Sequence, residues 1–418
     1  MEKKHLKSRN TGRILSRLIA RLGVLGISAI TLFMIVKMSQ ADLKAATDPT
    51  EALRWSKSYS KALLKRNKIY LEKKDFTPED ASHIEVQSKL ALLGAPLNYE
   101  SFLDIAQSRN LIGEGKRHRA LFDLAHRRNK RSSKALKELI VLELQNKEFI
   151  AAIKKIDMLF RRKSTAAPKF IPILSLLSKV PNAREEIDRY LKSSPIWGLE
   201  YLGHEISNLV PETIDTVTKS LGMFIQDDPD SDSNLTLQAQ FFSKLILLGY
   251  EAKAFELWTS MPVHKGNIPI REIYNGDFTQ NQAPAPYNWS FKKDQNFYAE
   301  IDRAGGLYAS FKSDTPEILA EQYVHLNPGK SYTLSTNARW TYKERQGYYA
   351  WTLTCLDELK SFGALILNDD ISKSASPAVT IHIPPIGCQT QLLQLVGFSG
   401  TYSTRIWLQT ESISLRLN

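Results

Sequence analysis

The spacing of apolar residues changes twice along this chain. Residues 22–36 form an unbroken apolar run, LGVLGISAITLFMIV. From residue 48 to about residue 260, apolar residues recur at intervals of three and four, which is the period of amphipathic helices. After residue 261 the period becomes two, which is typical of strands with one buried face. The pattern therefore predicts an apolar segment, a helical region and a β domain, in that order.

The apolar run has a strongly basic sequence before it. Residues 1–21 carry seven Lys and Arg residues, and Lys37 follows the run. We expect a transmembrane anchor at residues 22–38 with the basic tail in the cytoplasm, because basic flanks stay on the cytoplasmic side. The alternative is a cleaved signal peptide, because Ser39-Gln40-Ala41 places small residues at the positions that cleavage requires.

Both alternatives place most of the chain on the far side of a membrane. For a bacterial chain, the anchor predicts a single-pass protein of the inner (cytoplasmic) membrane, with its N-terminus inside and its bulk in the periplasm. The signal peptide predicts a soluble periplasmic protein.

The helical region contains a repeat of about 34 residues. Ala120, Ala151 and Ala254 each lie five residues after a turn residue, and they are 31 and then 103 residues apart. A two-helix unit of this period, with a small residue where helices cross, resembles the tetratricopeptide (TPR) repeat. We therefore expect TPR-like α-helical repeats over residues 48–260, and the alternative is an irregular all-α domain. Such arrays offer concave surfaces to peptides and proteins, so the resemblance implies a protein partner.

The β domain shows short apolar-alternating segments separated by Gly, Pro and Asn. This texture predicts an antiparallel β-sandwich of the jelly-roll kind over residues 261–418. The candidate strands are 307–311, 318–326, 331–340, 348–356, 362–368, 378–383, 390–397 and 405–417.

The opening of the β domain carries a resemblance. Ile273-Tyr-Asn-Gly-Asp-Phe278, followed by Asn288-Trp289, is similar to the entry of carbohydrate-binding-module-like jelly rolls. That family ends on a strand with paired acids near a structural calcium, but only Glu411 is in place here, so we expect no metal. With the anchor and the repeats, the whole chain is similar to proteins of proteobacterial exopolysaccharide clusters.

Sugar-binding domains stack aromatic rings on pyranose faces and surround them with a few polar groups. The resemblance therefore implies candidate carbohydrate-binding residues in this domain. Tyr342 and Tyr348 stand at the ends of a polar loop, and Trp289 follows the opening motif. Asn337 and Arg339 lie on the polar side of the strand expected at residues 331–340 and can supply hydrogen bonds.

The formal net charge of +12 is concentrated near the N-terminus. Residues 1–40 hold eight Lys and Arg residues against one acid, whereas residues 261–418 hold 14 of each. The basic composition therefore describes the flank of the apolar run and does not predict a nucleic-acid partner.

The two cysteines both lie in the β domain. Cys355 shares an apolar row with Trp351 and Leu353, and Cys388 stands at the start of a strand. Beyond the membrane, two cysteines in one β domain are expected to oxidise, so we predict a Cys355–Cys388 disulfide. The alternative is a pair of buried free thiols.

Catalytic motifs are not found in the sequence: it has no zinc-binding H-E-x-x-H, no G-x-S-x-G elbow and no phosphate loop. We therefore expect a non-catalytic scaffold without cofactors, attached to the inner membrane. Its repeats would bind a protein and its jelly roll a polysaccharide, in exopolysaccharide or envelope glycan assembly or export. The alternative is a polysaccharide-acting enzyme that uses the β-sandwich.

Overall fold

The computed structural model describes most of the chain, in two compact units of residues 1–166 and 167–418. The described residues are 27–113, 118–162, 165, 167–261, 272–279, 283–303, 305–341, 347–356, 361–367, 376–399 and 406–418.

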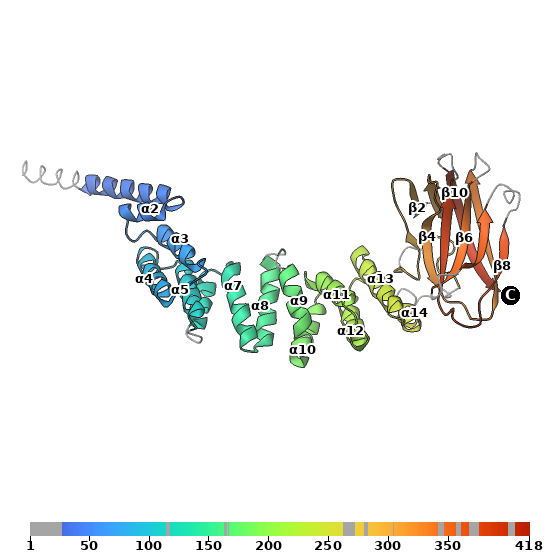
Figure 1. Ribbon diagram of the computed structural model, residues 1–418, viewed down its shortest axis with the longest axis horizontal. Coiled ribbons are helices and arrows are strands. Elements are labelled where there is room, and N and C mark those ends of the chain that lie inside the picture. Colours follow the sequence, from blue (N-terminus) through green and yellow to red (C-terminus); the bar gives the residue numbers. More distant parts are fainter. Residues whose placement is uncertain are drawn as a thin grey trace, which may run out of the picture. The chain divides into compact units, whose positions relative to one another are not determined.

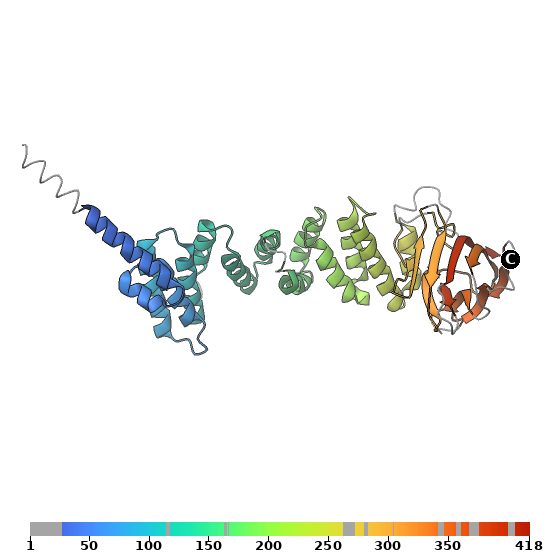
Figure 2. The ribbon, with the colours of Figure 1, turned by 90° about the horizontal axis from the view of Figure 1, so that it is seen from above.

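The first unit is an array of helices packed against their neighbours in sequence (Figures 1 and 2). Residues 27–45 are helical. The helices that follow are α2 (Pro49–Trp55), α3 (Ser60–Leu71), α4 (Pro78–Gly94), α5 (Tyr99–Leu111), α6 (Arg119–Arg128), α7 (Ser133–Gln145) and α8 (Phe149–Arg162).

Local sequence explains where these helices begin. The Thr77 hydroxyl accepts a hydrogen bond from the Asp80 backbone nitrogen, and the Asp80 side chain accepts one from the Thr77 backbone. Pro78 stands at the first helical position, where its missing N–H costs nothing. Asn98 and Ser132 cap α5 and α7 in a similar way.

No helix in the described part of the chain is long and apolar enough to cross a membrane. The anchor expected at residues 22–38 begins outside the described residues, and its residues 27–38 are helical. Large apolar side chains along this stretch are exposed: Ile27, Ile30, Leu32, Phe33, Met34, Ile35, Val36 and Met38.

The second unit begins with six more helices. They are α9 (Ala167–Leu177), α10 (Pro181–Leu191), α11 (Gly198–Ser207), α12 (Ile214–Ile225), α13 (Asp232–Leu247) and α14 (Glu251–Thr259), with a 3-10 turn at Pro211–Thr213.

The expected repeat is present in the helix order. Alternate helices start at Tyr99, Ser133, Ala167, Gly198 and Asp232, so they are spaced by 34, 34, 31 and 34 residues. This spacing confirms TPR-like helical hairpins. Of the alanines that suggested the period, Ala254 is fully buried, whereas Ala151 is half-buried and Ala120 is exposed. Ala152 and Ala125, both fully buried, take the packed positions in those two hairpins.

A β-sandwich completes the second unit. Its strands are β1 (Ser290–Phe291), β2 (Phe297–Ile301), β3 (Leu307–Phe311), β4 (Glu317–Val324), β5 (Ser331–Thr341), β6 (Tyr348–Cys355), β7 (Ser361–Leu367), β8 (Ala378–His382), β9 (Gln391–Phe398) and β10 (Ile406–Leu417). One sheet has the order β1-β4-β9-β6-β7 and the other β2-β3-β10-β5-β8, and all pairings are antiparallel. The eight expected strands all exist, while β1 and β2 were not predicted.

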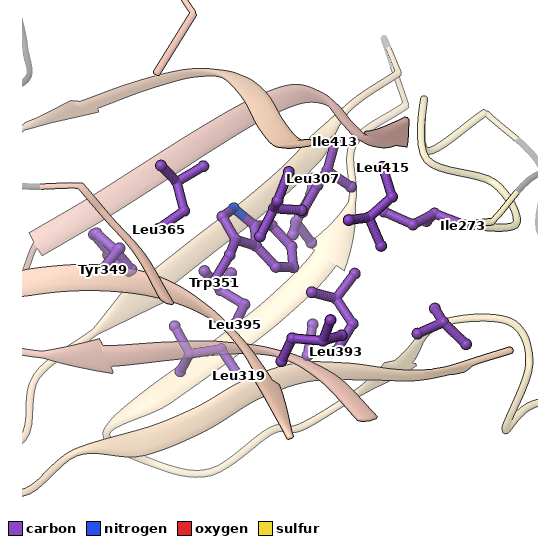
Figure 3. Close-up of a cluster of buried hydrophobic side chains, with 14 of the residues drawn as sticks. Ile273, Leu307, Leu319, Tyr349, Trp351, Leu365, Leu393, Leu395, Ile413 and Leu415 are labelled. Carbon is purple, nitrogen blue, oxygen red and sulfur yellow. The ribbon is translucent and has the colours of Figure 1, made fainter. Parts of the chain in front are cut away.

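The core of the sandwich lies between the two sheets. Trp351 from β6 and Leu393 and Leu395 from β9 are fully buried there (Figure 3). Leu353 from β6 is fully buried in the same core. The Cys355–Cys388 disulfide is present in the same core, with the two Cα atoms 5.4 Å apart. The disulfide prediction is therefore confirmed.

The opening motif packs on the last strand. A Cβ atom on Gly276 would lie 2.3 Å from the Ile413 carbonyl oxygen, so the position accepts no larger residue. The Ile413 backbone nitrogen donates to the Gly276 carbonyl at 2.7 Å. Phe278 is fully buried against Trp289, with ring centroids 5.3 Å apart. The N-G-D-F segment thus closes one side of the core.

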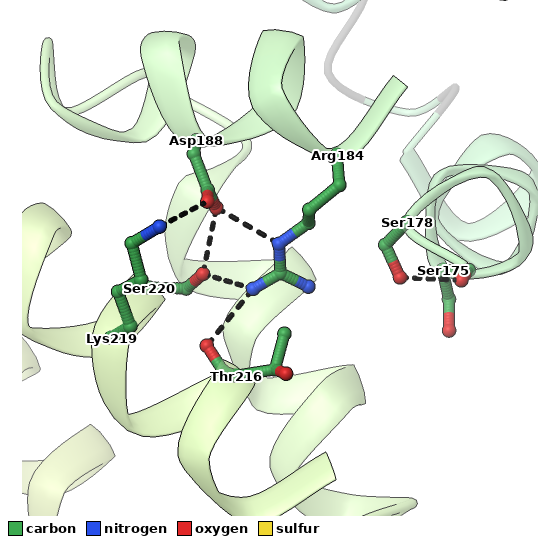
Figure 4. A network of polar contacts seen from close by, with 7 residues as sticks. All are labelled: Ser175, Ser178, Arg184, Asp188, Thr216, Lys219 and Ser220. Atoms are coloured by element: carbon green, nitrogen blue, oxygen red, sulfur yellow. Dashed lines mark hydrogen bonds and ion pairs between the residues drawn. The ribbon is translucent and has the colours of Figure 1, made fainter. Parts of the chain in front are cut away.

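The helices of the second unit are also joined by polar contacts. Arg184 in α10 donates to the Asp188 carboxylate at 3.0 Å and to the Thr216 carbonyl of α12 at 3.0 Å (Figure 4). The buried Ser220 hydroxyl of α12 donates to Asp188 at 2.8 Å and contacts Arg184. Because each charge has a partner, burying this pair avoids an unpaired ion between the helices.

The last helix of the array packs directly on the sandwich segment 283–287. Trp258 is 1% exposed, and its ring contacts Tyr274 and Tyr287 with centroid distances of 5.0 and 5.5 Å. Phe255 stacks on His325 at 4.8 Å. Aromatic rings from both sides of the domain boundary expected at residue 261 therefore pack against one another.

Candidate binding surfaces

Three aromatic rings lie on the outer face of the second sheet. Tyr298 of β2, Tyr308 of β3 and Trp407 of β10 alternate with core residues of their strands. The register places Tyr298 and Trp407 on either side of Ser310 and places Tyr308 in the neighbouring row, so the three rings lie on three adjacent strands. The Tyr298 and Tyr308 centroids are 5.7 Å apart, and Trp407 is 37% exposed. We call Tyr298, Tyr308 and Trp407 the aromatic row.

Polar side chains surround the aromatic row. Glu300, Gln409 and Arg339 lie on the strands beside Tyr308, in the same row of the register as that ring. Glu411 accepts a hydrogen bond from the Asn337 amide at 2.6 Å and pairs with Arg339 at 3.3 Å. Rings next to amides, a carboxylate and a guanidinium are the side-chain types that bind sugar rings and hydroxyls.

The structure therefore brings Asn337 and Arg339, two of the expected sugar-binding residues, to the edge of the aromatic row. Tyr348 lies elsewhere, on the outer side of the first sheet, where it is half-buried beside Phe398 at a centroid distance of 5.5 Å. Tyr342 lies outside the described residues.

Trp289 lies in the core instead of on a surface. It is 6% exposed, and its indole nitrogen donates to the Asn275 carbonyl at 3.0 Å. Its ring packs between Phe278 and Trp351. The Trp289 ring is therefore a packing element of the core and offers no stacking surface to a sugar.

Trp407 was not among the expected sugar-binding residues. The alternation Ile406, Leu408 and Thr410 against Trp407, Gln409 and Glu411 was available in the sequence. That alternation separates the tryptophan from the apolar positions, because successive side chains of a strand point to opposite faces. The polar residues Gln409 and Glu411, on the same side of the strand as Trp407, were the signal that could have identified Trp407 as a surface residue.

The first unit offers a hollow on the side formed by alternate helices. Side chains of α3, α5 and α7 line a volume of about 380 Å³. The lining mixes charges of both signs, amides and leucines: Lys68, Leu71, Glu72, Gln107, Asn110, Leu111, Lys134 and Glu138. We call this hollow the α3–α5–α7 groove. Such a mixture can bind both the backbone and the side chains of a peptide.

A buried polar cluster links two of the groove helices, α3 and α5. Asn67 of α3 donates to the Ser88 hydroxyl at 2.8 Å and to the Asp104 carboxylate at 3.0 Å. Burial raises the pKa of Asp104 to about 6, although the hydrogen bond from Asn67 opposes this shift. The cluster joins α3 and α5, two of the helices that line the groove, to α4.

A similar hollow of about 410 Å³ occurs in the second unit, between α11 and α13. Its lining includes Leu199, Gly203, Asp232, Thr236 and Gln240. Within each unit, the hollow therefore lies on the first helices of neighbouring hairpins, which is a side that stacked hairpins use for binding.

Comparison with known proteins gives structural likenesses but no family. No protein-family model and no curated protein matches the chain. A solved structure described as "CBM4 structure and function" is 17% identical and covers 35% of this chain and 99% of its own, with a TM-score of 0.27. YrrB, described as a TPR protein with an unusual peptide-binding site, is 8% identical and covers 51% and 90%, with a TM-score of 0.27. The MamA protein is 13% identical and covers 47% and 88%, with a TM-score of 0.23.

Proposed function

We propose that this chain is a non-catalytic scaffold that binds a polysaccharide through its β-sandwich and a protein through its helical repeats. The aromatic row carries the proposal. A single exposed tryptophan needs no explanation, but three rings on adjacent strands, flanked by Gln409 and by the Asn337–Glu411 pair, match the chemistry that recognises sugars.

The helical repeats supply the second binding surface. The α3–α5–α7 groove is lined by side chains from three helices, which hold its amides and charges at fixed spacing. An extended peptide matches this groove, because amide side chains can pair with a peptide backbone.

The scaffold would be held at a membrane by the N-terminal apolar segment, with the repeats and the sandwich in the periplasm. The exposed apolar side chains of residues 27–38 support membrane attachment. A scaffold in this position would serve the assembly or export of an exopolysaccharide or another envelope glycan. Alkaline phosphatase fused after residue 60 should be active in this topology, and an inactive fusion would refute it.

Binding of purified polysaccharides by the full chain tests the glycan function. Calorimetry should show binding to at least one envelope glycan, and Trp407→Ala should weaken it about tenfold or more, because the ring supplies a stacking face. Tyr348→Ala is the control, since that ring lies on the other sheet and should leave affinity unchanged. Equal affinity of both variants would exclude the aromatic row. Release of new reducing ends would indicate an enzyme.

A further inference from the structure

The helix at residues 27–45 is joined firmly to the array at its C-terminal end. Ala41 and Ala45 are buried, and Ala45 belongs to a cluster with Ala52 of α2 and Ala62 of α3. Small residues at these positions let the three helices approach closely. The apolar part of the helix, residues 27–38, extends away from the other helices of this unit (Figures 1 and 2).

Polar contacts fix the same junction. Asp42 lies one helical turn after Met38, and its carboxylate accepts hydrogen bonds from the Tyr59 hydroxyl and from Lys61, the latter at 2.7 Å. Tyr59 ends the turn between α2 and α3, so this turn lies beside the base of the apolar stretch. The helix therefore leaves the array in a direction that the fold determines.

Three cations and an exposed tryptophan lie at the end of the apolar stretch or just before the turn that contacts Asp42. Arg54, Trp55 and Lys57 are exposed at the end of α2, and Lys37 lies over the Phe33 ring at 5.1 Å. We call Lys37, Arg54, Trp55 and Lys57 the collar. In the part of the chain that the structure describes, none of its three cations forms an ion pair.

The nearby acids do not neutralise the collar. Asp42 pairs with Lys61 and Glu51 with Lys44, while Asp48 caps α2. The surface at the base of the apolar helix is therefore positive and carries an exposed indole. Tryptophan favours the boundary between hydrocarbon and water, and Lys and Arg side chains near the surface are attracted to anionic lipids.

We propose that the collar docks on anionic lipid headgroups and thereby sets the orientation of the array on the membrane. This inference rests on the proposed membrane attachment. The apolar stretch enters the bilayer, and the collar lies at headgroup level. Ala41, Asp42 and Ala45 hold the helix against the start of the array, so the orientation of the helix in the membrane also fixes that of the first hairpin, α3–α4.

Vesicle flotation of the full chain tests the collar. The vesicles are phosphatidylcholine alone, or with about 30% phosphatidylglycerol, which supplies the anionic surface. Arg54→Ala with Lys57→Ala should lower partitioning onto the anionic vesicles by about tenfold or more and leave the neutral vesicles unaffected. Arg127→Ala with Lys130→Ala removes one exposed Arg and one exposed Lys at the same spacing in α6–α7 and should change neither. Equal partitioning of the two double variants on anionic vesicles would overturn the proposal.

A second variant separates the collar from the attachment itself. Leu32→Asp with Ile35→Asp should abolish flotation with both vesicle types, and retained flotation with neutral vesicles would refute membrane attachment. Brominated lipid should quench tryptophan emission of the full chain, and Trp55→Phe should remove most of this quenching, whereas Trp407→Phe should not. Undiminished quenching in Trp55→Phe would place the indole away from the lipid.

Discussion

The indole nitrogen of Trp258 donates a hydrogen bond to the backbone carbonyl of Pro284, 3.0 Å away. Trp258 belongs to the last helix of the array and Pro284 to the segment that enters the sandwich. The Tyr287 hydroxyl adds a second link, because it donates to the Glu251 carbonyl at 3.2 Å. The helix and the sandwich therefore share one buried aromatic cluster.

Trp258→Ala should destabilise the second unit by about 3–5 kcal/mol, because it removes a fully buried indole and its hydrogen bond. Trp258→Phe should cost less, since it keeps most of the ring. Urea unfolding followed by near-UV circular dichroism measures both changes. Trp55→Ala, at an exposed site, should change the free energy of unfolding by less than about 0.5 kcal/mol. Equal effects of Trp258→Ala and Trp55→Ala would contradict the shared cluster.

Stability should fall as the pH rises from about 4 to about 6, through Asp104. Burial raises the pKa of this carboxyl to about 6, so the folded chain keeps a proton that the unfolded chain releases in this window. A shift of about two pKa units corresponds to ~3 kcal/mol lost above the window. Denaturant unfolding at several pH values should show this decline.

Asp104→Asn should remove that decline, because the amide is neutral at every pH. The exposed Asp75→Asn variant should keep the wild-type profile and serves as the control. An unchanged slope in Asp104→Asn would show that another group titrates in this window.

Removing the disulfide should destabilise the sandwich. Cys355 and Cys388 are 33 residues apart, and a loop of this length contributes about 3–4 kcal/mol in the chain-entropy model. The double variant Cys355→Ala, Cys388→Ala should lower the urea midpoint accordingly. Reductant present during unfolding should lower the wild-type midpoint and leave that of the double variant unchanged. A reductant effect on both proteins would point to another cause.

The contact between α10 and α12 should show strong coupling. Arg184→Leu should cost about 3 kcal/mol or more, because it leaves the Asp188 carboxylate buried with weakened partners. Asp188→Leu alone should also destabilise, but the double variant should cost less than the sum of the two. A double-mutant cycle by chemical unfolding should give a coupling of about 1–3 kcal/mol. Additive losses would show that the two side chains act independently.

The α3–α5–α7 groove should contact the protein partner directly. A photo-crosslinking amino acid at Asn110, inside the groove, should trap a partner protein in cells that make the full chain. Leu111→Asp should remove the crosslinked product, because it places a charge on an apolar contact. The same probe at Ser82, exposed on α4, is the control. Equal trapping at Ser82 would locate the partner elsewhere.

Much of the secondary structure could be predicted because its signals are local. β3 to β10 lie within two residues of the expected strands, since alternation of apolar and polar residues is written into each segment. The helix starts every 31 to 34 residues also follow from period and capping. β2 was missed, because its five residues form a strand by pairing with β3.

The location of the candidate site depended on tertiary contacts. Trp289 and Trp407 both looked suitable for a surface or a core, and only the packing of the opening motif against β10 buried the first. Asn337 and Arg339 both contact Glu411, which lies 72 or more residues later in the chain. Glu411 becomes their neighbour only because β10 pairs with β5.

The last strand, β10, shows most clearly which features the sequence alone does not determine. Ile406 and Leu408 face the core before the register shift between Thr410 and Ser412, and Ile413 and Leu415 face it afterwards. The inward side thus changes from even to odd positions within one strand. The sequence by itself determined that β10 has an apolar and a polar side. The pairing with β3 and β5 decided where the sides exchange, because a bulge forms only where two strands meet, and so placed Trp407 on the outer face.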